Sequence, residues 1–187
     1  MESSSGRSEP HDPRSDLATA EQARQRLAAN LRLPAGLFPA LGVAVAVQIG
    51  SAAVGIAQQT TAGIAVLLGG LAVFLLVAAP ALQRFRRING VRVDGLSAQI
   101  VLGTGAMSTL AYLAGLAAGT WAAFEAQWWL VAAAAMAGGA GYALGVRRWW
   151  SAYRHDPAAH ASGASPRLLA LLGALACAGL AALLVVG

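Results

Sequence analysis

The chain has 187 residues, of which 57% are hydrophobic and 11% charged, and its 13 basic and 8 acidic side chains give a formal net charge of +5. Soluble domains average about 45–50% apolar and about 25% charged residues, so this composition excludes a disordered chain, a collagen, a disulfide-rich scaffold and a typical soluble globule. A mean hydropathy of +0.60 predicts instead an all-α fold, a polytopic bundle of transmembrane helices.

The first 34 residues are predicted to form a cytoplasmic tail. Met1–Asp16 is rich in Ser, Pro and charge, and we expect it to be disordered. Ser15–Leu33 is predicted to be a short amphipathic helix, capped by Ser15 and ended by Pro34, which would lie along the lipid headgroups.

Residues 35–187 are predicted to form one transmembrane domain of five spans. Crossing a bilayer takes about 20 apolar residues. Runs of that length occupy about 37–57, 61–82, 96–120, 127–146 and 168–187. Only Gln58, Gln59 and Thr60 separate the first two spans, which predicts a tight helical hairpin.

All basic residues are Arg, and their distribution predicts the orientation. They fall in the N-terminal tail, between spans two and three, and between spans four and five, and in no other connection. Under the positive-inside rule we expect the N-terminus inside and the C-terminus outside. The lack of Lys and the abundance of Ala suggest GC-rich coding, and we expect a multi-pass protein of a bacterial plasma (inner) membrane. The predicted cytoplasmic basic surface beyond the tail consists of Arg84, Arg86, Arg87, Arg92, Arg147, Arg148 and Arg154.

Aromatic residues mark both predicted membrane boundaries. Trp121, Trp128 and Trp129 lie at the outer ends of spans three and four, and Trp149 and Trp150 lie at the inner end of span four. We interpret them as an aromatic belt that anchors the helices at the headgroup level.

None of the five spans contains an Asp, Glu, Lys, Arg or His in its interior. Proton relays, voltage sensors and carboxylate coupling sites need such groups, so we expect no enzymatic activity, no cofactor and no metal. Glu125 is interpreted as a solvated turn carboxylate, and His155, Asp156 and His160 as members of a solvated loop.

Small and polar residues recur at three- and four-residue steps and therefore share helix faces. The predicted face consists of Gln48 and Ser51 in span one, Thr104, Ser108, Tyr112, Gly115 and Gly119 in span three, and Gly141, Tyr142 and Gly145 in span four. We favour a role in helix packing, because close backbone approach and interhelical hydrogen bonds drive association in lipid. The alternative is a pocket for a neutral or lipidic ligand, lined by Gln48, Ser108, Tyr112 and Tyr142.

The connection between spans two and three contains Asn89-Gly90, a dipeptide typical of a type I′ β-hairpin turn. The arginines around it and those of the later connection would face anionic lipid headgroups. We find no module that would bind nucleic acid.

The sequence therefore predicts a non-catalytic accessory, assembly or scaffold protein that acts through helix faces and basic cytoplasmic loops. Its expected partners are anionic headgroups of the bilayer and either another membrane protein or a second copy of the chain. The alternative function is a small oligomeric transporter or channel for a neutral or lipidic ligand. On the packing interpretation, Gly141→Leu is expected to disrupt assembly.

Overall fold

The computed structural model describes residues 13–90, 100 and 105–156, and this part of the chain is all-α. Its helices are α1 (Pro13–Asn30), α2 (Leu37–Gln58), α3 (Thr61–Asn89), α5 (Ala106–Phe124) and α6 (Trp128–His155). The last four are long and apolar enough to cross a membrane. They make the chain a candidate multi-pass membrane protein. The predicted fifth span, 168–187, lies outside the described residues.

The first predicted span corresponds to α2, but the second predicted span ends too early. Helix α3 continues through Pro80 to Asn89, so that Arg84, Arg86 and Arg87 lie on a helix and not in a loop. Hydropathy detects only the apolar part of a helix. The backbone hydrogen bonds of α3 extend beyond it, into a stretch of strong helix formers such as Leu, Gln and Arg.

The predicted hairpin turn at Asn89-Gly90 is wrong. Asn89 is the last residue of α3, and Gly90 ends the helix with φ 67° while its N–H donates to the Arg86 carbonyl. A type I′ turn needs positive φ at both central residues. Asn89 does not have it, since the only described non-glycine residues with positive φ are Gln59 and Ala126. The glycine is used here as a helix C-cap.

The other two described spans also differ from their predicted bounds. The third was expected to run without a break over 96–120, but Gly105 has the extended φ and ψ of a helix N-cap and α5 begins at Ala106. Helix α6 begins as predicted and continues to His155, which places Arg147, Arg148 and Arg154 on its last turns.

The N-terminal helix begins earlier than predicted. Pro13 opens α1, a favourable first position because proline has no N–H to leave unpaired. Ser15 is therefore inside the helix and not its cap, and Pro13–Asp16 is helical where disorder was expected. The helix ends at Asn30, before Pro34 is reached. Residues 1–12 lie outside the described part.

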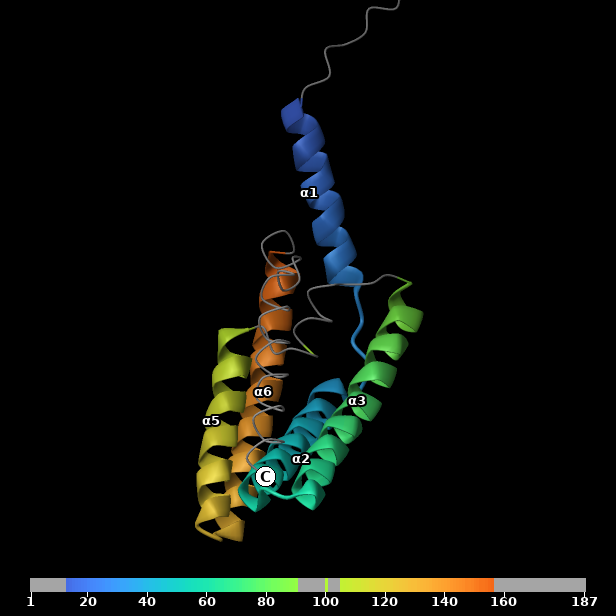
Figure 1. The fold of residues 1–187 in the computed structure, drawn as a ribbon. Coiled ribbons are helices and arrows are strands. Elements are labelled where there is room, and N and C mark those ends of the chain that lie inside the picture. Colours follow the sequence, from blue (N-terminus) through green and yellow to red (C-terminus); the bar gives the residue numbers. More distant parts are fainter. Residues whose placement is uncertain (1–12, 91–99, 101–104, 157–187) are drawn as a thin grey trace, which may run out of the picture.

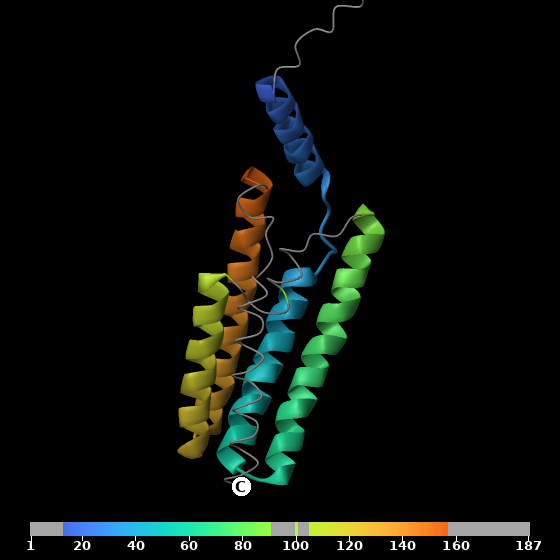
Figure 2. The same ribbon diagram turned by 45° about the horizontal axis from the view of Figure 1, so that its top comes forward.

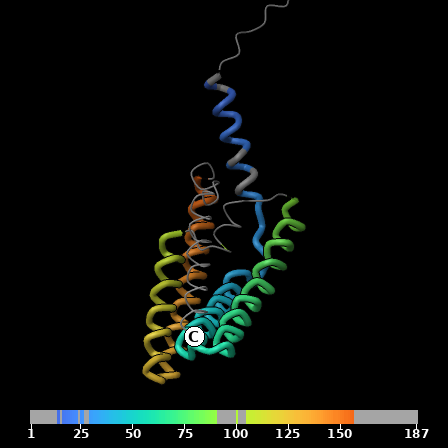
Figure 3. The backbone as a smooth tube through the Cα atoms, viewed as in Figure 1, coloured from blue at the N-terminus to red at the C-terminus, as the bar shows by residue number. Residues whose placement is uncertain are grey.

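Helix α2 occupies the centre of the bundle and packs against α3, α5 and α6, while α5 packs against α6. Figures 1 and 2 show two antiparallel hairpins side by side, α2 with α3 and α5 with α6. Helix α1 projects from the end of the bundle at which α2 begins and α6 ends, and the tube in Figure 3 follows the chain from α1 into α2.

Two short connections close these hairpins at the opposite end. Gln59 and Thr60 join α2 to α3, with Gln59 in the left-handed region and the Thr60 side chain accepting a hydrogen bond from the Gly63 N–H. The tight hairpin expected here is present. Glu125, Ala126 and Gln127 join α5 to α6, and Ala126 has φ 55°.

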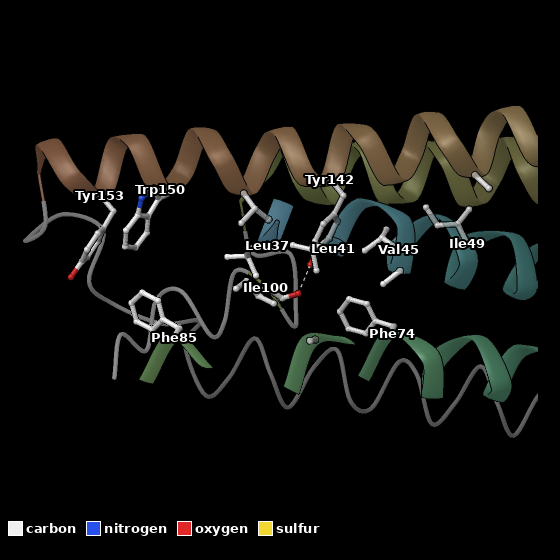
Figure 4. Packing of buried hydrophobic residues seen from close by; sticks show 14 residues of the cluster. Leu37, Leu41, Val45, Ile49, Phe74, Phe85, Ile100, Tyr142, Trp150 and Tyr153 are labelled. Carbon is white, nitrogen blue, oxygen red and sulfur yellow. Dashed lines mark hydrogen bonds between the residues drawn. The ribbon is translucent and has the colours of Figure 1, made fainter. Parts of the chain in front are cut away.

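The buried core follows the inner side of α2 and continues along α6. Leu41, Val45 and Ile49 are each no more than 1% exposed, and Tyr142 and Val146 of α6 face them. Figure 4 shows Phe74 and Phe85 of α3 on the other side of this cluster. Apolar side chains on the outer sides of the helices are exposed, as expected for spans surrounded by lipid.

Trp150 does not belong to a surface belt. Its exposed fraction is 7%, and its ring meets Phe85 of α3 edge-on at 6.0 Å between centroids. Tyr153 stacks on both Trp149 and Trp150, at 5.4 and 5.6 Å. In contrast, Trp121, Trp128 and Trp129 at the other end are 56–71% exposed, where a belt residue is expected.

Candidate functional site

The polar face predicted from spacing forms a seam between three helices. The Gln48 Nε2 of α2 donates a hydrogen bond of 2.8 Å to the Tyr112 hydroxyl of α5. The Tyr112 ring in turn meets the Tyr142 ring of α6 edge-on, with 6.5 Å between centroids. Both Gln48 and Tyr112 are half-buried. One polar pair thus links the two hairpins of the bundle.

Ser108 and Tyr142 lie deeper in the same seam. The Ser108 hydroxyl is fully buried and donates to the Tyr142 backbone carbonyl at 3.3 Å. The Tyr142 hydroxyl donates at 2.9 Å to the carbonyl of Ile100, which precedes α5 in the chain and is itself fully buried. Figure 4 shows this bond as a dashed line. The tyrosine therefore ties α6 to the segment that leads into α5.

The glycines of the seam bring α5 and α6 into backbone contact. A Cβ added to Gly115 would lie 2.9 Å from the Gly138 Cα, and one added to Gly138 would lie 2.7 Å from the Ile49 Cδ1 of α2. Ile49 therefore fills the junction of three helices. Gly115 and Gly119 are four residues apart and form a GxxxG pair, and a Cβ added to Gly119 would lie 3.4 Å from the Ala53 Cβ of α2.

The second GxxxG pair lies on the facing side of α6. A Cβ on Gly141 would lie 2.7 Å from the Ala111 Cβ, and one on Gly145 would collide with the Ser108 side chain and lie 2.8 Å from its backbone nitrogen. Both glycines thus face α5 of the same protomer. Gly141 was expected to contribute to assembly. In this structure it packs α6 against α5 within one chain.

Ser51 lies on the side of α2 that faces α3. Its hydroxyl donates to the Gln48 carbonyl at 3.0 Å, and its Cβ would lie 2.7 Å from a Cβ added to Gly70 of α3. Gly55 and Gly63 pack against each other further along this interface. Thr104, the remaining residue of the predicted face, lies outside the described residues.

Sequence reasoning missed the tightest contact between α2 and α6. A Cβ on Gly139 would collide with the Gly42 carbonyl oxygen and lie 2.9 Å from the Ala46 Cβ. Neither Gly42 nor Gly139 is part of a predicted motif, and the only sequence signal was a glycine in each apolar run. Among the described residues, every buried side-chain nitrogen or oxygen has a hydrogen-bond partner.

The predicted basic surface lies on the last turns of two helices at one end of the bundle. The exposed residues of this surface are Arg84, Arg86 and Arg87 on α3, and Arg147, Arg148 and Arg154 on α6. Arg92 lies outside the described residues. Helix α1, which carries both basic and acidic residues, projects from the same end (Figure 1), and Arg32 of its linker is exposed there.

Asn89 fixes the linker between α1 and α2 to the end of α3. Its Oδ1 accepts from the Arg32 N–H at 2.7 Å, and its Nδ2 donates to the Arg32 carbonyl at 2.8 Å and to the Phe85 carbonyl at 2.9 Å. The Asn89 side-chain amide therefore hydrogen-bonds both the N–H and the carbonyl of Arg32, as a backbone peptide group can. No pattern in the sequence signals this contact, which spans 57 residues.

Two hollows lie where α1 and its linker meet the end of α6. One, of about 580 Å³, is lined by Ala29, Asn30, Leu31, Arg32, Leu33, Trp150 and Arg154. The other, of about 490 Å³, is lined by Ala29, Phe38, Arg147, Trp150, Ser151, Arg154 and His155. Arg154 donates a hydrogen bond of 3.4 Å from Nη2 to the Ala29 carbonyl, so its side chain connects α6 to α1.

The remaining predicted candidates have simple surroundings. Glu125 is exposed in the α5–α6 connection, and its N–H donates to the Trp121 carbonyl at 3.2 Å. The prediction that His155 lies in a loop is wrong, because it is the last residue of α6; Asp156 is the C-cap of this helix, and both are exposed. His160 lies outside the described residues. The part of the chain that the structure describes contains no group of three His, Cys, Asp or Glu side chains that could hold a metal ion.

Comparisons with protein-family models, curated proteins and solved structures gave no match for this chain.

Proposed function

We propose that this chain is a five-span protein of a bacterial plasma (inner) membrane, with its N-terminus inside, its C-terminus outside and 168–187 as its fifth span. The position of the arginines supports this orientation. Those on α3 and α6 lie at one end of the bundle, the end from which α1 projects. At the opposite end are the two short connections, which contain no basic residue. The positive-inside rule makes the arginine-rich end cytoplasmic.

Its proposed role is that of a non-catalytic accessory, assembly or scaffold component. The observation that carries this proposal is the internal use of the polar seam. The side chains of Gln48, Ser108 and Tyr142 all donate hydrogen bonds within the protomer. The polar groups that a transporter would offer to a substrate serve here to join helices.

Within the described part of the chain, the surfaces that we propose for contacts with other molecules are an apolar face and a cationic end. Helix α3 packs mainly on α2, so its outer side is uncovered among the described residues. The large apolar side chains exposed on it are Val66, Leu68, Leu71, Val73, Leu75 and Leu76. In a bilayer such a face meets either lipid tails or the span of a partner protein, and the basic end adds a surface for cytoplasmic contacts.

The alternative, a small oligomeric transporter or channel, rests on Gln48 and Tyr112. Both are only half-buried, so a neutral ligand could reach them if they gave up their mutual hydrogen bond. A transport role therefore requires this pair to open. The accessory role requires it to stay closed.

Native mass spectrometry of the full chain, extracted gently from its own membranes, tests the two proposals. A stoichiometric second polypeptide supports the accessory role, and a homo-oligomer with a retained small molecule supports the transporter. A monomer that carries lipid alone contradicts both.

A pair of matched variants then locates the contact face. Leu76 of α3 is 73% exposed and Leu110 of α5 is 68% exposed. If the α3 face binds the partner, Leu76→Trp reduces the amount of complex recovered and Leu110→Trp does not. Equal recovery with both variants contradicts a role for α3.

A further inference from the structure

Two hollows adjoin each other beside Trp150. They share Ala29, Trp150 and Arg154, which lie where α1 contacts the end of α6, and we refer to the two hollows together as the groove. Each volume falls in the range of about 300–1,000 Å³ that is usual for ligand sites. Trp150, only 7% exposed, forms a rigid wall common to both, because its ring is held by Phe85 and Tyr153.

The charge of the groove selects for an anion. Arg32 lines one hollow, Arg147 lines the other, and Arg154 lines both. The described residues that line them include no Asp or Glu. Three guanidinium groups around one groove match the chemistry of a phosphate group, because guanidinium donates paired hydrogen bonds to two phosphate oxygens.

The position of the groove favours a lipid over other anions as its ligand. It lies directly beyond the apolar part of α6, at the level where headgroups begin under the proposed orientation. Leu33 and Phe38 give its wall an apolar part, and Arg32, Arg147 and Arg154 give it a cationic part. A phospholipid has the same arrangement, with an anionic phosphate next to an apolar glycerol ester and tails.

Contacts around the groove restrain the Arg154 side chain and the Arg32 backbone before any ligand binds. The bond between Arg154 and the Ala29 carbonyl uses one of the five N–H donors of the guanidinium. The bonds between Asn89 and the Arg32 backbone fix the linker from which the Arg32 side chain extends. Such preorganisation lowers the entropic cost of binding.

From these observations we propose that the groove between α1 and the end of α6 binds the headgroup of an anionic phospholipid, with Arg32, Arg147 and Arg154 as the phosphate-binding side chains. This site is distinct from the general attraction of a basic surface for a membrane, since it is limited to three of the arginines at this end. Arg86 and Arg87 carry the same charge at the same end, but they line neither hollow.

That distinction supplies a matched control. The full chain is purified in a neutral detergent, and short-chain phosphatidylglycerol is titrated into it by calorimetry. The double variant Arg32→Gln/Arg147→Gln is compared with Arg86→Gln/Arg87→Gln, which removes the same net charge. We expect the first to raise the Kd at least about tenfold, as loss of charge-assisted hydrogen bonds implies, and the second to change it less than about twofold.

Equal weakening by both double variants would show a diffuse electrostatic effect and overturn the proposal, as would no weakening by either. Phosphatidylcholine that binds as tightly as phosphatidylglycerol overturns it too, because the site would then not recognise negative charge. Inorganic phosphate or an acidic peptide that binds as tightly as the lipid shows that the glycerol ester and tails contribute nothing, and contradicts a lipid site.

Folding of each variant is checked by circular dichroism and by its elution volume. If the double variant elutes as an aggregate, Arg147→Gln alone is used, because the exposed Arg147 side chain can be shortened without disturbing the bond between Arg154 and α1. A single variant with unchanged affinity for phosphatidylglycerol counts against the proposal.

Discussion

The contact between Gly139 and α2 predicts that Gly139→Ala destabilises the bundle. The added Cβ would collide with the Gly42 carbonyl and lie 2.9 Å from the Ala46 Cβ. Carbon atoms pack best at about 3.5–4.0 Å, so α2 and α6 must separate by about 1 Å at this level. A gap of that size forfeits between a quarter and a half of the dispersion energy of each contact it widens. Leu41 and Val45 of α2 belong to the same buried cluster as Tyr142 and Val146 of α6, so contacts of this cluster are among those affected.

The magnitude follows from two opposing effects. Overpacking of a closely packed interior costs typically about 1–3 kcal/mol. Alanine is favoured over glycine in a helix by up to about 1 kcal/mol, which offsets part of this cost. We therefore expect a net loss of about 1–2 kcal/mol in the free energy of unfolding.

Gly69→Ala is the control, because nothing lies within 4 Å of a Cβ added to this exposed glycine of α3. Only the helix preference acts there, and we expect stability equal to the native chain or greater by up to about 1 kcal/mol. The assay is equilibrium unfolding of the full chain in mixed micelles with increasing dodecyl sulfate, followed by circular dichroism. The reasoning is refuted if the free energy of unfolding of Gly139→Ala is within about 0.5 kcal/mol of that of the native chain. It is also refuted if Gly69→Ala is destabilised as much as Gly139→Ala.

Three further predictions concern hydrogen bonds and orientation. A double-mutant cycle of Gln48→Ala and Tyr112→Phe should give a coupling energy of about 0.6 kcal/mol and at most about 1.7, as for other interhelical bonds in membranes, and zero coupling would mean that the bond does not form. Asn89→Ala should release the linker and speed trypsin cleavage after Arg32 by about tenfold, whereas an unchanged cleavage rate would contradict the role of this contact. A phosphatase reporter that is active only on the outer side of the membrane should be inactive when it is fused after Tyr153, because this end of α6 is proposed to be cytoplasmic. Activity of this fusion would contradict the proposed orientation.

The sequence predicts where the described spans lie but not where their helices end. Hydropathy reports which residues tolerate lipid, and it detected the apolar parts of α2, α3, α5 and α6. A helix ends where its backbone hydrogen bonds end. In α3 and α6 that point comes several residues beyond the apolar run, because arginine and alanine sustain a helix in water as well as in lipid.

The polar seam was predictable as a set of residues but not as a set of pairs. Helical spacing placed Ser108 and Tyr112 on one face, and the structure shows that they contact different groups, the Tyr142 carbonyl and the Gln48 amide. Gly138 and Gly139 show the same limit. They are neighbours in the chain and differ by about 100° around the helix, so that Gly138 meets the backbone of α5 and the tip of Ile49, whereas Gly139 meets the backbone of α2. Which glycine meets which helix depends on the arrangement of the bundle.

The central position of α2 has a consequence for how the protein is made. Translation delivers the N-terminal segments first, so α2 is in the membrane before α3, α5 and α6, each of which packs against it. Helix α3 can pair with α2 as soon as the two-residue connection at Gln59 and Thr60 has formed. The hairpin of α5 and α6 then finds a partner surface that is already present. After α2, each described span of the bundle has an earlier span to pack against when it enters.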